Sequence, residues 1–200
     1  MIKILFIIAG YLCGSIPWGY ILCRVFIKKD IRNYGSRNIG ATNVYRVAGG
    51  FLALSVLVLD ILKGFLPVFI AKSYFHFSSL FLICIGIACV IGHNFSCFLK
   101  GKGGKGVSTS FGVIIGLFPL AAFFSFIVWI AMVITTHYIS VGSLCASLAL
   151  PFFLHICYKD PVYTSTGIII FGLILYSHRE NIKRVLQKKE NSIRLPWEKK

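Results

Sequence analysis

The sequence predicts an all-α integral membrane protein with seven transmembrane helices, formed as a single domain by residues 1–200. Three observations predict this class: an apolar composition, a series of long apolar runs, and basic residues gathered in alternate connections. Hydrophobic residues make up 57% of the chain and charged residues 14%, and the mean hydropathy is +0.82. A soluble domain of 200 residues cannot hide that much apolar surface, whereas the hydrocarbon of a bilayer can surround it.

Apolar runs long enough to cross a bilayer follow one another along the chain. A transmembrane helix needs about 20 residues to cross about 30 Å of hydrocarbon. One run, 107–118, is shorter, and a helix of about 12 residues rises only about 18 Å. It either crosses at a thinned place or beside other helices, or it is re-entrant. The seven expected helices cover residues 2–23, 47–71, 77–97, 107–118, 119–136, 139–158 and 161–177.

The distribution of Lys and Arg indicates that the short run spans. With seven spans, 17 of the 21 basic residues lie on the side of the C-terminal tail, and only Lys3, Lys72 and Lys159 lie on the other. Without the short span, the tail changes sides and the count becomes 10 against 10. Because cytoplasmic connections carry the excess of Lys and Arg, we expect the N-terminus outside and the C-terminus in the cytoplasm.

The net charge of +15 limits the class of partner. A nucleic-acid-binding protein needs a soluble basic face, and most of this chain is apolar, so we expect no nucleic-acid partner. Basic flanks that contact membrane lipids and anionic substrates explain the charge better. The seven cysteines form no C-x-x-C pair and lie mostly in apolar runs, where a thiol acts as a small hydrophobe. We therefore expect no disulfide and no metal site.

Two charged residues, Asp60 and Lys63, lie in the middle of the second expected span. They are three residues apart and so share one face of a helix. Charges inside a bilayer are costly and are usually paired. The two residues therefore form either a self-neutralising pair that braces the helix bundle or part of a polar cavity with a direct function.

Four polar segments could carry chemistry, and the predicted topology puts all of them at the cytoplasmic ends of helices. The first covers residues 35–43 and is followed by Arg46. Its glycines, hydroxyls and amides are typical of concave loops whose N–H groups hold anions, and a nearby guanidinium can clamp a phosphate. The alternative is an ordinary interfacial loop whose arginines contact lipid phosphates.

The second polar segment is a basic loop that follows His93 and Asn94 and carries four glycines between residues 100 and 109. It contains G-x-G-x-x-G, but a membrane helix precedes it and not a strand, so a dinucleotide site is excluded. Val107 stands where a Walker A loop requires Lys. A basic loop that leads into a helix N-terminus can still hold an anion through free N–H groups and Lys charge. The alternative is a positive flank with incidental glycines.

The third and fourth polar segments cover residues 140–143 and 178–181. Ser143 either caps the sixth span or offers its hydroxyl to a ligand. His178 and Asn181 are three residues apart on one helix face. Alone, a histidine at the membrane surface is usually a solvated cap, but beside other anion-binding segments His178 is a candidate to position or deprotonate a hydroxyl.

Taken together, these segments resemble the PlsY family, the bacterial acyl-phosphate:glycerol-3-phosphate acyltransferases. The resemblance covers most of the chain, and it is specific because all the segments occur in this order. One departure is Arg37, where many members carry Gly; the added positive charge should not abolish binding. The matching segments are Gly14-Ser15-Ile16-Pro17, the loop 35–43, Gly92-His93-Asn94-Phe95, Gly103-Gly104-Lys105-Gly106, Ser140-Val141-Gly142-Ser143 and His178-Arg179-Glu180-Asn181.

The resemblance implies a multi-pass enzyme of the bacterial cytoplasmic membrane that opens phospholipid biosynthesis. Its partners would be acyl phosphate, glycerol 3-phosphate and membrane lipids, and its products lysophosphatidic acid and phosphate. No cofactor and no metal are implied, acyl-CoA is not the donor, and a monomer is the working assumption. An acyl phosphate is a mixed anhydride with a good leaving group, so catalysis needs mainly positioning and charge stabilisation.

The resemblance also implies roles for single residues. Arg46 and Lys105 would hold the phosphate of glycerol 3-phosphate, while Ser143, His178 and Asn181 would orient its hydroxyls. The base is left open between His178 and a substrate phosphate. The catalytic candidates are Ser36, Arg46, Lys105, Ser143, His178 and Asn181. The candidates for substrate binding are Asn38, Gly40, Thr42, Asn43, His93, Asn94, Gly103 and Gly104, with Ser36 also placed at the acyl phosphate.

Other classes remain as alternatives. An anion or phosphate transporter would keep its polar site near the midplane, where this chain has only Asp60 and Lys63. A membrane scaffold without chemistry would tolerate Gly103→Val or Lys105→Ala. His155 and Asp160 spell the H-x-x-x-x-D signature of acyl-CoA-type acyltransferases. Because the predicted topology puts that pair at the outer end of the sixth span, we interpret the match as chance.

Overall fold

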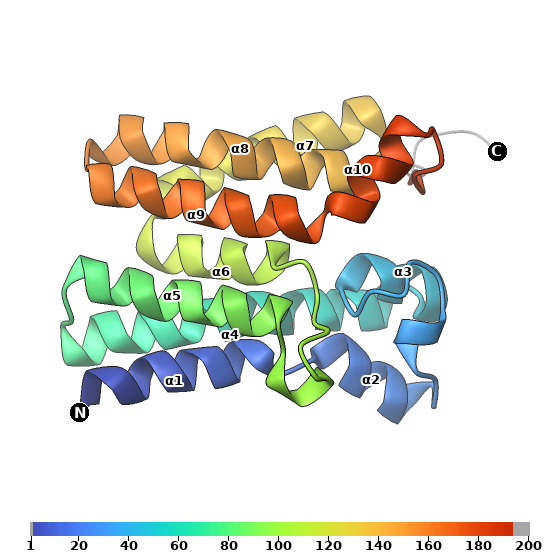
Figure 1. Ribbon diagram of the computed structural model, residues 1–200, viewed down its shortest axis with the longest axis horizontal. Helices are drawn as coiled ribbons and strands as arrows, with labels where there is room; N and C mark the ends of the chain where they lie inside the picture. Colours follow the sequence, from blue (N-terminus) through green and yellow to red (C-terminus); the bar gives the residue numbers. More distant parts are fainter. Residues whose placement is uncertain (1, 194–200) are drawn as a thin grey trace. The chain divides into compact units, whose positions relative to one another are not determined.

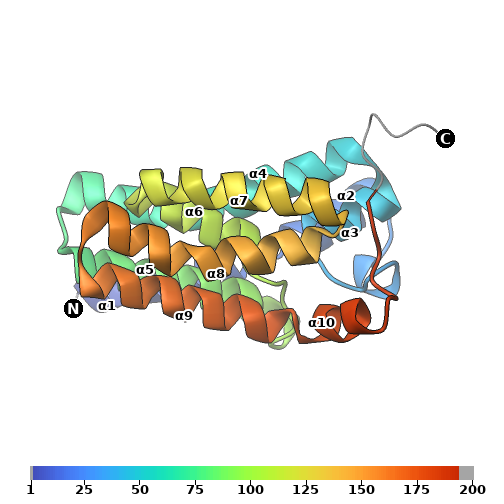
Figure 2. The same ribbon diagram turned by 90° about the horizontal axis from the view of Figure 1, so that it is seen from above.

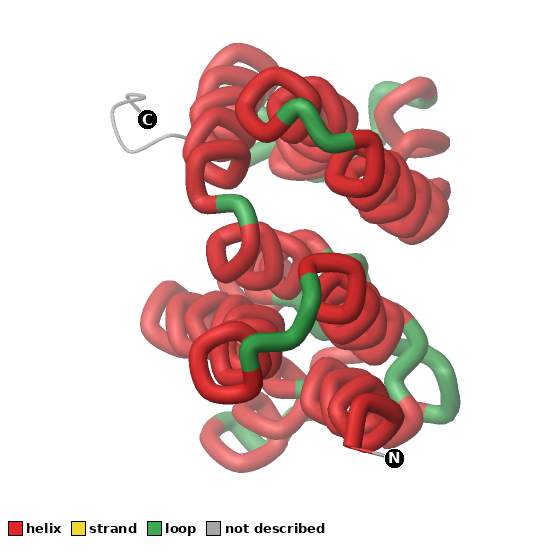
Figure 3. Tube along the Cα trace, turned by 90° about the vertical axis from the view of Figure 1, so that its left-hand side faces the viewer, coloured by secondary structure: helices red, strands yellow, loops and turns green. Residues whose placement is uncertain are grey.

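The computed structural model describes residues 2–193, and this part of the chain folds into α-helices and two 3-10 turns without any strand (Figures 1 and 3). The all-α class predicted from the composition is confirmed. The chain divides into two compact units, Met1–Leu117 and Phe118–Lys200. We call them unit 1 and unit 2.

Unit 1 packs its long apolar helices side by side. α1 lies along α5, α4 lies along α6, and α4 also contacts α1 and α5, while the shorter α2 and α3 pack against α4. 3-10 turns at Ile31–Asn33 and Cys97–Leu99 interrupt the two polar connections. The helices of unit 1 are α1 (Ile2–Ser15), α2 (Trp18–Phe26), α3 (Ala41–Ala48), α4 (Gly50–Phe75), α5 (Ser79–Asn94) and α6 (Val107–Leu117).

The first expected span is broken, which corrects the prediction of one helix over residues 2–23. α1 ends at Ser15, α2 begins at Trp18, and the two are bent by 41°. Pro17 has no N–H to continue the helical ladder and its ring crowds the preceding turn. At the break, the Ile16 carbonyl accepts from the N–H of Trp18 at 3.2 Å and from the ammonium of Lys63 at 2.7 Å.

Glycines let the backbones of unit 1 approach closely. A Cβ added at Gly14 of α1 would lie 2.0 Å from the carbonyl oxygen of Cys89 on α5, and one added at Gly64 of α4 would lie 2.2 Å from the carbonyl oxygen of Thr109 on α6. Small residues at such crossings are a common way to pack helices in a membrane, where the lipid gives no hydrophobic drive. These two crossings bring the end of α1 against α5 and the start of α6 against the middle of α4.

Unit 2 is built on α8, which packs against α7 on one side and α9 on the other (Figure 2). Prolines occupy the first turns of α7 and α9, where a missing N–H costs nothing. Asp160 caps α9 by accepting from the N–H of Val162 at 2.7 Å. Its carboxylate is therefore used in capping. The helices of unit 2 are α7 (Pro119–Thr136), α8 (Ile139–Tyr158), α9 (Pro161–Ser177) and α10 (Arg179–Leu186).

Helices occupy all seven predicted positions. The predicted ranges 119–136, 139–158 and 161–177 agree with α7, α8 and α9 at both ends, whereas the earlier helices have shifted ends. Four of them are long and apolar enough to cross a bilayer, and the bent pair α1 and α2 would make five. α6 and α9 are shorter apolar helices of 11 and 17 residues. α4 begins at Gly50 and not at 47, because residues 47 and 48 belong to the separate helix α3.

Candidate active site

The polar segment 35–43 is folded around the buried side chain of Asn43. Its Nδ2 donates to the carbonyls of Asn38 at 2.8 Å and Tyr34 at 3.0 Å, and its Oδ1 accepts from the N–H of Ser36 at 2.8 Å. Both ends of the carboxamide are therefore used inside the chain. Asn43, predicted to bind substrate, is placed by the structure as the internal support of the loop.

The rest of this segment is shaped by tight turns and by the start of α3. The side chain of Asn38 accepts from the N–H of Gly40 at 2.9 Å, and Gly40 is the residue before the first turn of α3. Thr42 lies in that first turn and Arg46 in the last. The predicted loop therefore continues as the short helix α3. The hydrogen bond between Asn38 and Gly40 fixes the backbone just before that helix begins.

The glycine-rich loop is bonded to the end of α5. The N–H of Gly104 donates to the carbonyl of His93 at 2.9 Å, and the N–H of Gly103 donates to the carbonyl of Asn94 at 3.1 Å. The expectation that these two N–H groups face a ligand is therefore corrected, since both are used within the chain. Lys105 follows directly and precedes α6 by two residues.

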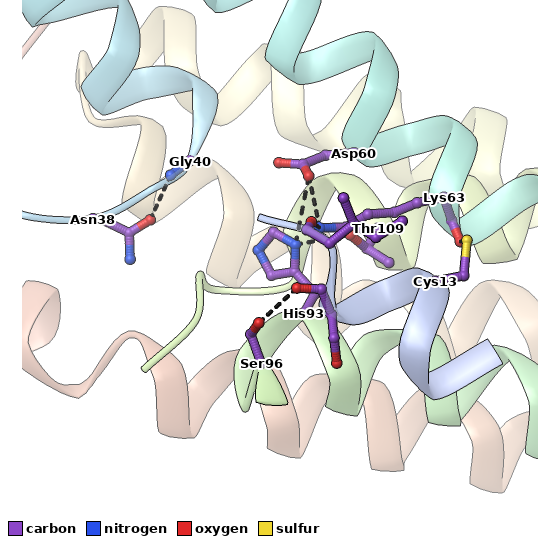
Figure 4. A network of polar contacts seen from close by, with 10 residues as sticks. Cys13, Asn38, Gly40, Asp60, Lys63, His93, Ser96 and Thr109 are labelled. Carbon is purple, nitrogen blue, oxygen red and sulfur yellow. Dashed lines mark hydrogen bonds and ion pairs between the residues drawn. The ribbon is translucent and has the colours of Figure 1, made fainter. Parts of the chain in front are cut away.

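A buried polar network lies beneath this loop (Figure 4). Asp60 and Lys63 form an ion pair at 2.8 Å with side chains only 3% exposed, which confirms the pairing predicted from their spacing. His93 Nδ1 shares a hydrogen bond with Thr109 Oγ1 at 3.0 Å and lies 3.8 Å from Asp60 Oδ1. Nothing in the sequence indicates that His93 belongs to this network, because its partners are 16 or more positions away.

In unit 2, Ser143 is buried in the second turn of α8. Its hydroxyl donates to the carbonyl of Ile139 at 2.9 Å and accepts from Trp129 Nε1 at 3.4 Å. The possibility that Ser143 caps the helix is wrong, because α8 begins at Ile139 with Tyr138 before it. Its hydroxyl is thus an interior group of the unit.

His178 lies at the junction of α9 and α10 and is only 2% exposed. It is therefore a buried residue and not a solvated cap. Its Nδ1 is 2.9 Å from the carbonyl oxygen of Ile174, and a carbonyl can only accept, so Nδ1 carries the proton. In the neutral ring Nε2 is then the nitrogen that can accept a proton, which is the form a general base needs.

Glu190 is a residue that the sequence analysis missed. Its Oε1 accepts from Asn181 Nδ2 at 2.6 Å and from the hydroxyl of Ser140 at 2.9 Å, and its Oε2 accepts from Arg184 Nε at 2.8 Å. Burial alone would raise the pKa of Glu190, but these three donors outweigh burial and lower the pKa. Glu190 is one of three acids in a basic tail, and nothing in the sequence distinguishes it from the other two.

The orientation of Asn181 follows from that contact. Because Nδ2 donates to Glu190, the carboxamide oxygen points the other way. This oxygen is buried and accepts no hydrogen bond within the described chain, although a carboxamide oxygen can accept two. Asn181 therefore offers an acceptor, which suits a hydroxyl donor.

Apolar helices with hydroxyl, amide and basic groups at their ends are typical of a polytopic membrane protein with a functional polar site. The family described as glycerol-3-phosphate acyltransferase matches residues 4–188. The chain belongs to this family, and it is accordingly an acyltransferase. Within residues 2–193, no three His, Cys, Asp or Glu side chains form a group that could hold a metal ion.

Relatives of similar length support this assignment. A glycerol-3-phosphate acyltransferase of Fusobacterium nucleatum is 40% identical, with 94% of this chain and 97% of the relative aligned. Another, from Aquifex aeolicus, is 40% identical over 92% and 96% of the two chains. These relatives are acyltransferases and lend no support to the transporter alternative.

Two solved structures of PlsY, an integral membrane glycerol 3-phosphate acyltransferase, share the fold. Its glycerol 3-phosphate form is 38% identical with a TM-score of 0.92, and its lysophosphatidic acid form is 37% identical with a TM-score of 0.89. Both comparisons cover 97% of this chain and 96% of the other. The expected membership of the PlsY family is confirmed.

Proposed function

We propose that the protein transfers an acyl group from an acyl phosphate to the 1-hydroxyl of glycerol 3-phosphate. The observation that carries this proposal is the full-length relation to structures described in a glycerol 3-phosphate form and a lysophosphatidic acid form. The products are lysophosphatidic acid and inorganic phosphate. The two units act as one catalytic domain over residues 1–200.

The reaction needs little from the protein beyond positioning and charge. The hydroxyl oxygen attacks the acyl carbonyl carbon, the bond from that carbon to the phosphate oxygen breaks, and phosphate leaves with the electron pair. The hydroxyl proton goes to a base, either Nε2 of His178 or an oxygen of a substrate phosphate. Because the leaving group is good, oriented substrates and fixed cationic groups supply most of the acceleration.

Single residues have distinct proposed roles. Arg46 and Lys105 hold the phosphate of glycerol 3-phosphate, and the hydroxyl of Ser143 with Nε2 of His178 and the oxygen of Asn181 orient the glycerol hydroxyls. For His93 and Asn94, expected from the sequence to bind substrate, the proposed role is indirect, because their carbonyls hold the glycine-rich loop. Groups proposed to hold the acyl phosphate come from Ser36, Asn38, Gly40 and Thr42. Asn43 supports this loop from within, and the N–H groups of Gly103 and Gly104 bond the glycine-rich loop to the end of α5.

The proposed membrane arrangement has seven spans, with the N-terminus outside and the C-terminus in the cytoplasm of a bacterial cell. The excess of basic residues on one side supports it. Single cysteines placed at residue 3 and at residue 188 of a cysteine-free variant test it in intact cells. A membrane-impermeant thiol reagent should label the first and not the second; the reverse pattern would refute the orientation.

The donor is tested by turnover of the purified protein in detergent. Glycerol 3-phosphate is supplied with palmitoyl phosphate or, separately, with palmitoyl-CoA, and phosphate and lysophosphatidic acid are followed. Product from the acyl phosphate alone, abolished by Lys105→Ala, supports the proposal. Product from the CoA donor, or no product from either donor, refutes it and returns attention to His155 and Asp160.

The identity of the base is tested with His178→Gln. Glutamine can keep a hydrogen bond to the Ile174 carbonyl but cannot accept a proton, so an essential base would lose activity by about 100-fold or more. Turnover under saturating substrates measures this loss. Near-full activity of His178→Gln would instead assign the proton to a substrate phosphate.

A further inference from the structure

The buried ion pair of Asp60 and Lys63 in unit 1 also contacts other helices. Asp60 and Lys63 lie on α4 with their charged groups 2.8 Å apart and nearly out of contact with the surface. Apolar residues of similar volume often replace a buried ion pair without loss of stability. Stabilisation of the helix bundle alone therefore does not explain the Asp60–Lys63 pair. The contacts that the two residues make with other helices indicate a further role.

Those contacts connect α4 with three other parts of unit 1, namely the break between α1 and α2, α5 and α6. Lys63 donates to the Ile16 carbonyl at the break between α1 and α2, and Asp60 lies 3.8 Å from Nδ1 of His93 on α5. The same nitrogen of His93 shares a hydrogen bond with Thr109 on α6. Figure 4 shows the imidazole of His93 among Asp60, Lys63 and Thr109.

The other edge of the imidazole lies directly against the glycine-rich loop. A Cβ added at Gly104 would lie 2.0 Å from Nε2 of His93, and the N–H of Gly104 donates to the carbonyl of the same histidine. His93 therefore contacts the residue just before Lys105, and through Thr109 it contacts the helix that begins just after it. A turn of the ring would displace the backbone on either side of Lys105.

We propose that Asp60 and Lys63 are positioning residues of acyl transfer, which act through His93 and Thr109 to fix the loop that carries Lys105. The proposal rests on the phosphate-binding role of Lys105 proposed above. A displacement of about 1 Å in a binding group is enough to lower turnover about 100-fold. The network sets that distance from within the helices, without touching substrate.

The first test separates positioning from bracing with Asp60→Leu together with Lys63→Met. This double variant removes both charges at similar volume, so thermal unfolding should stay close to that of the parent protein. We expect KM for glycerol 3-phosphate to rise about 10-fold or more, with KM for the acyl donor little changed. Hydrogen exchange at the amides of residues 101–106 should also accelerate. A folded double variant with parental KM and parental exchange would overturn the proposal.

The second test uses Thr109, in case the double variant does not fold. Thr109→Val keeps the shape and removes the hydroxyl that bonds His93, whereas Thr109→Ser keeps the hydroxyl. We expect Thr109→Val to raise KM for glycerol 3-phosphate about 3- to 10-fold and to accelerate loop exchange, with Thr109→Ser close to the parent. Equal behaviour of the two variants would overturn the proposal.

A control and a separate readout make the tests specific. Ser125→Ala removes a buried hydroxyl from α7 in unit 2 and should change neither KM nor exchange in the loop. The exchange measurement needs no turnover. If the parent protein transferred no acyl group, the proposed function would fail, while exchange in Thr109→Val would still decide whether the network holds the loop.

Discussion

The two units hold their polar groups by different means. In unit 1 the site segments are fixed by the protein backbone and by a charge pair inside a span: Asn43 bonds neighbouring carbonyls, and the glycine-rich loop bonds the end of α5. In unit 2 a single carboxylate beyond the last helix, that of Glu190, connects Ser140 and Asn181. The arrangement of the polar groups therefore depends on close packing of the backbone in unit 1 and on one ionised carboxylate in unit 2.

This difference predicts which changes each unit tolerates. A backbone-held loop is sensitive to added volume, because the neighbouring carbonyls and rings have no room to move. A carboxylate-held cluster is sensitive to loss of charge and to acid, because its donors would be left unpaired when the carboxylate is gone. The variants below separate these two sensitivities, in order of expected effect.

The largest effect is expected for Gly104→Ala in unit 1. The new Cβ would lie 2.0 Å from Nε2 of His93, so the loop must move and carry Lys105 with it. We expect kcat/KM for glycerol 3-phosphate to fall about 100-fold or more. Gly172→Ala on α9 is the matched control, because a Cβ there meets nothing within 4 Å and alanine favours a helix. Equal activity of the two variants would contradict the tight fit of the loop.

A smaller but clear effect is expected for Glu190→Ala in unit 2. Three donors lose their acceptor, so the free energy of unfolding should fall by about 2–4 kcal/mol, and Asn181 should lose its orientation, which raises KM for glycerol 3-phosphate. Glu190→Gln retains an oxygen for Asn181 and Ser140 and should recover KM more than stability, because the charge that Arg184 contacts is still missing. Thermal unfolding and KM measure the two parts. A Gln variant as damaged as the Ala variant would show that the charge, and not the orientation of Asn181, is what matters.

The acid response should also belong to unit 2. Because the folded protein lowers the pKa of Glu190, the carboxylate stabilises the fold above the usual glutamate pKa of about 4.3, and this contribution disappears as pH falls through the lower folded value. The difference in unfolding free energy between the parent and Glu190→Gln should therefore be constant above about pH 5 and shrink in more acidic solution. If the difference between the two proteins did not change with pH, ionisation of Glu190 would be excluded as the cause of the acid response.

The smallest effect on the free energy of unfolding is expected for Asp30→Asn. Asp30 is the acid of unit 1 that lies outside the expected spans. Hydrogen bonds from the Arg32 side chain lower the pKa of Asp30, but the Arg32 side chain is 37% exposed, and such pairs contribute at most about 1 kcal/mol. KM should not change. A loss as large as that of Glu190→Ala would mean that unit 1 also depends on a surface charge.

Local features of the fold and site were predictable, and distant ones were not. The apolar runs and the Asp60–Lys63 pair follow from composition and from a spacing of three residues on one helix. The contact between Ser140 and Glu190 joins residues 50 positions apart, and the contact between His93 and the network depends on how three helices pack. The predicted start of the sixth span at residue 139 agrees with α8, so Ser143 lies in the second turn, which is too far from the end of the helix to cap it.

The break at Pro17 bears on how the chain enters the membrane. Lys63 is among the costliest residues to insert, at about 2.5–3.5 kcal/mol near the centre of a helix. Synthesis proceeds from the N-terminus, so the Ile16 carbonyl that accepts from Lys63 is already in place when α4 emerges. The interruption of the first span thus supplies an acceptor for α4, the second span, during biogenesis, and insertion of α4 should be less efficient when the chain lacks its first helix.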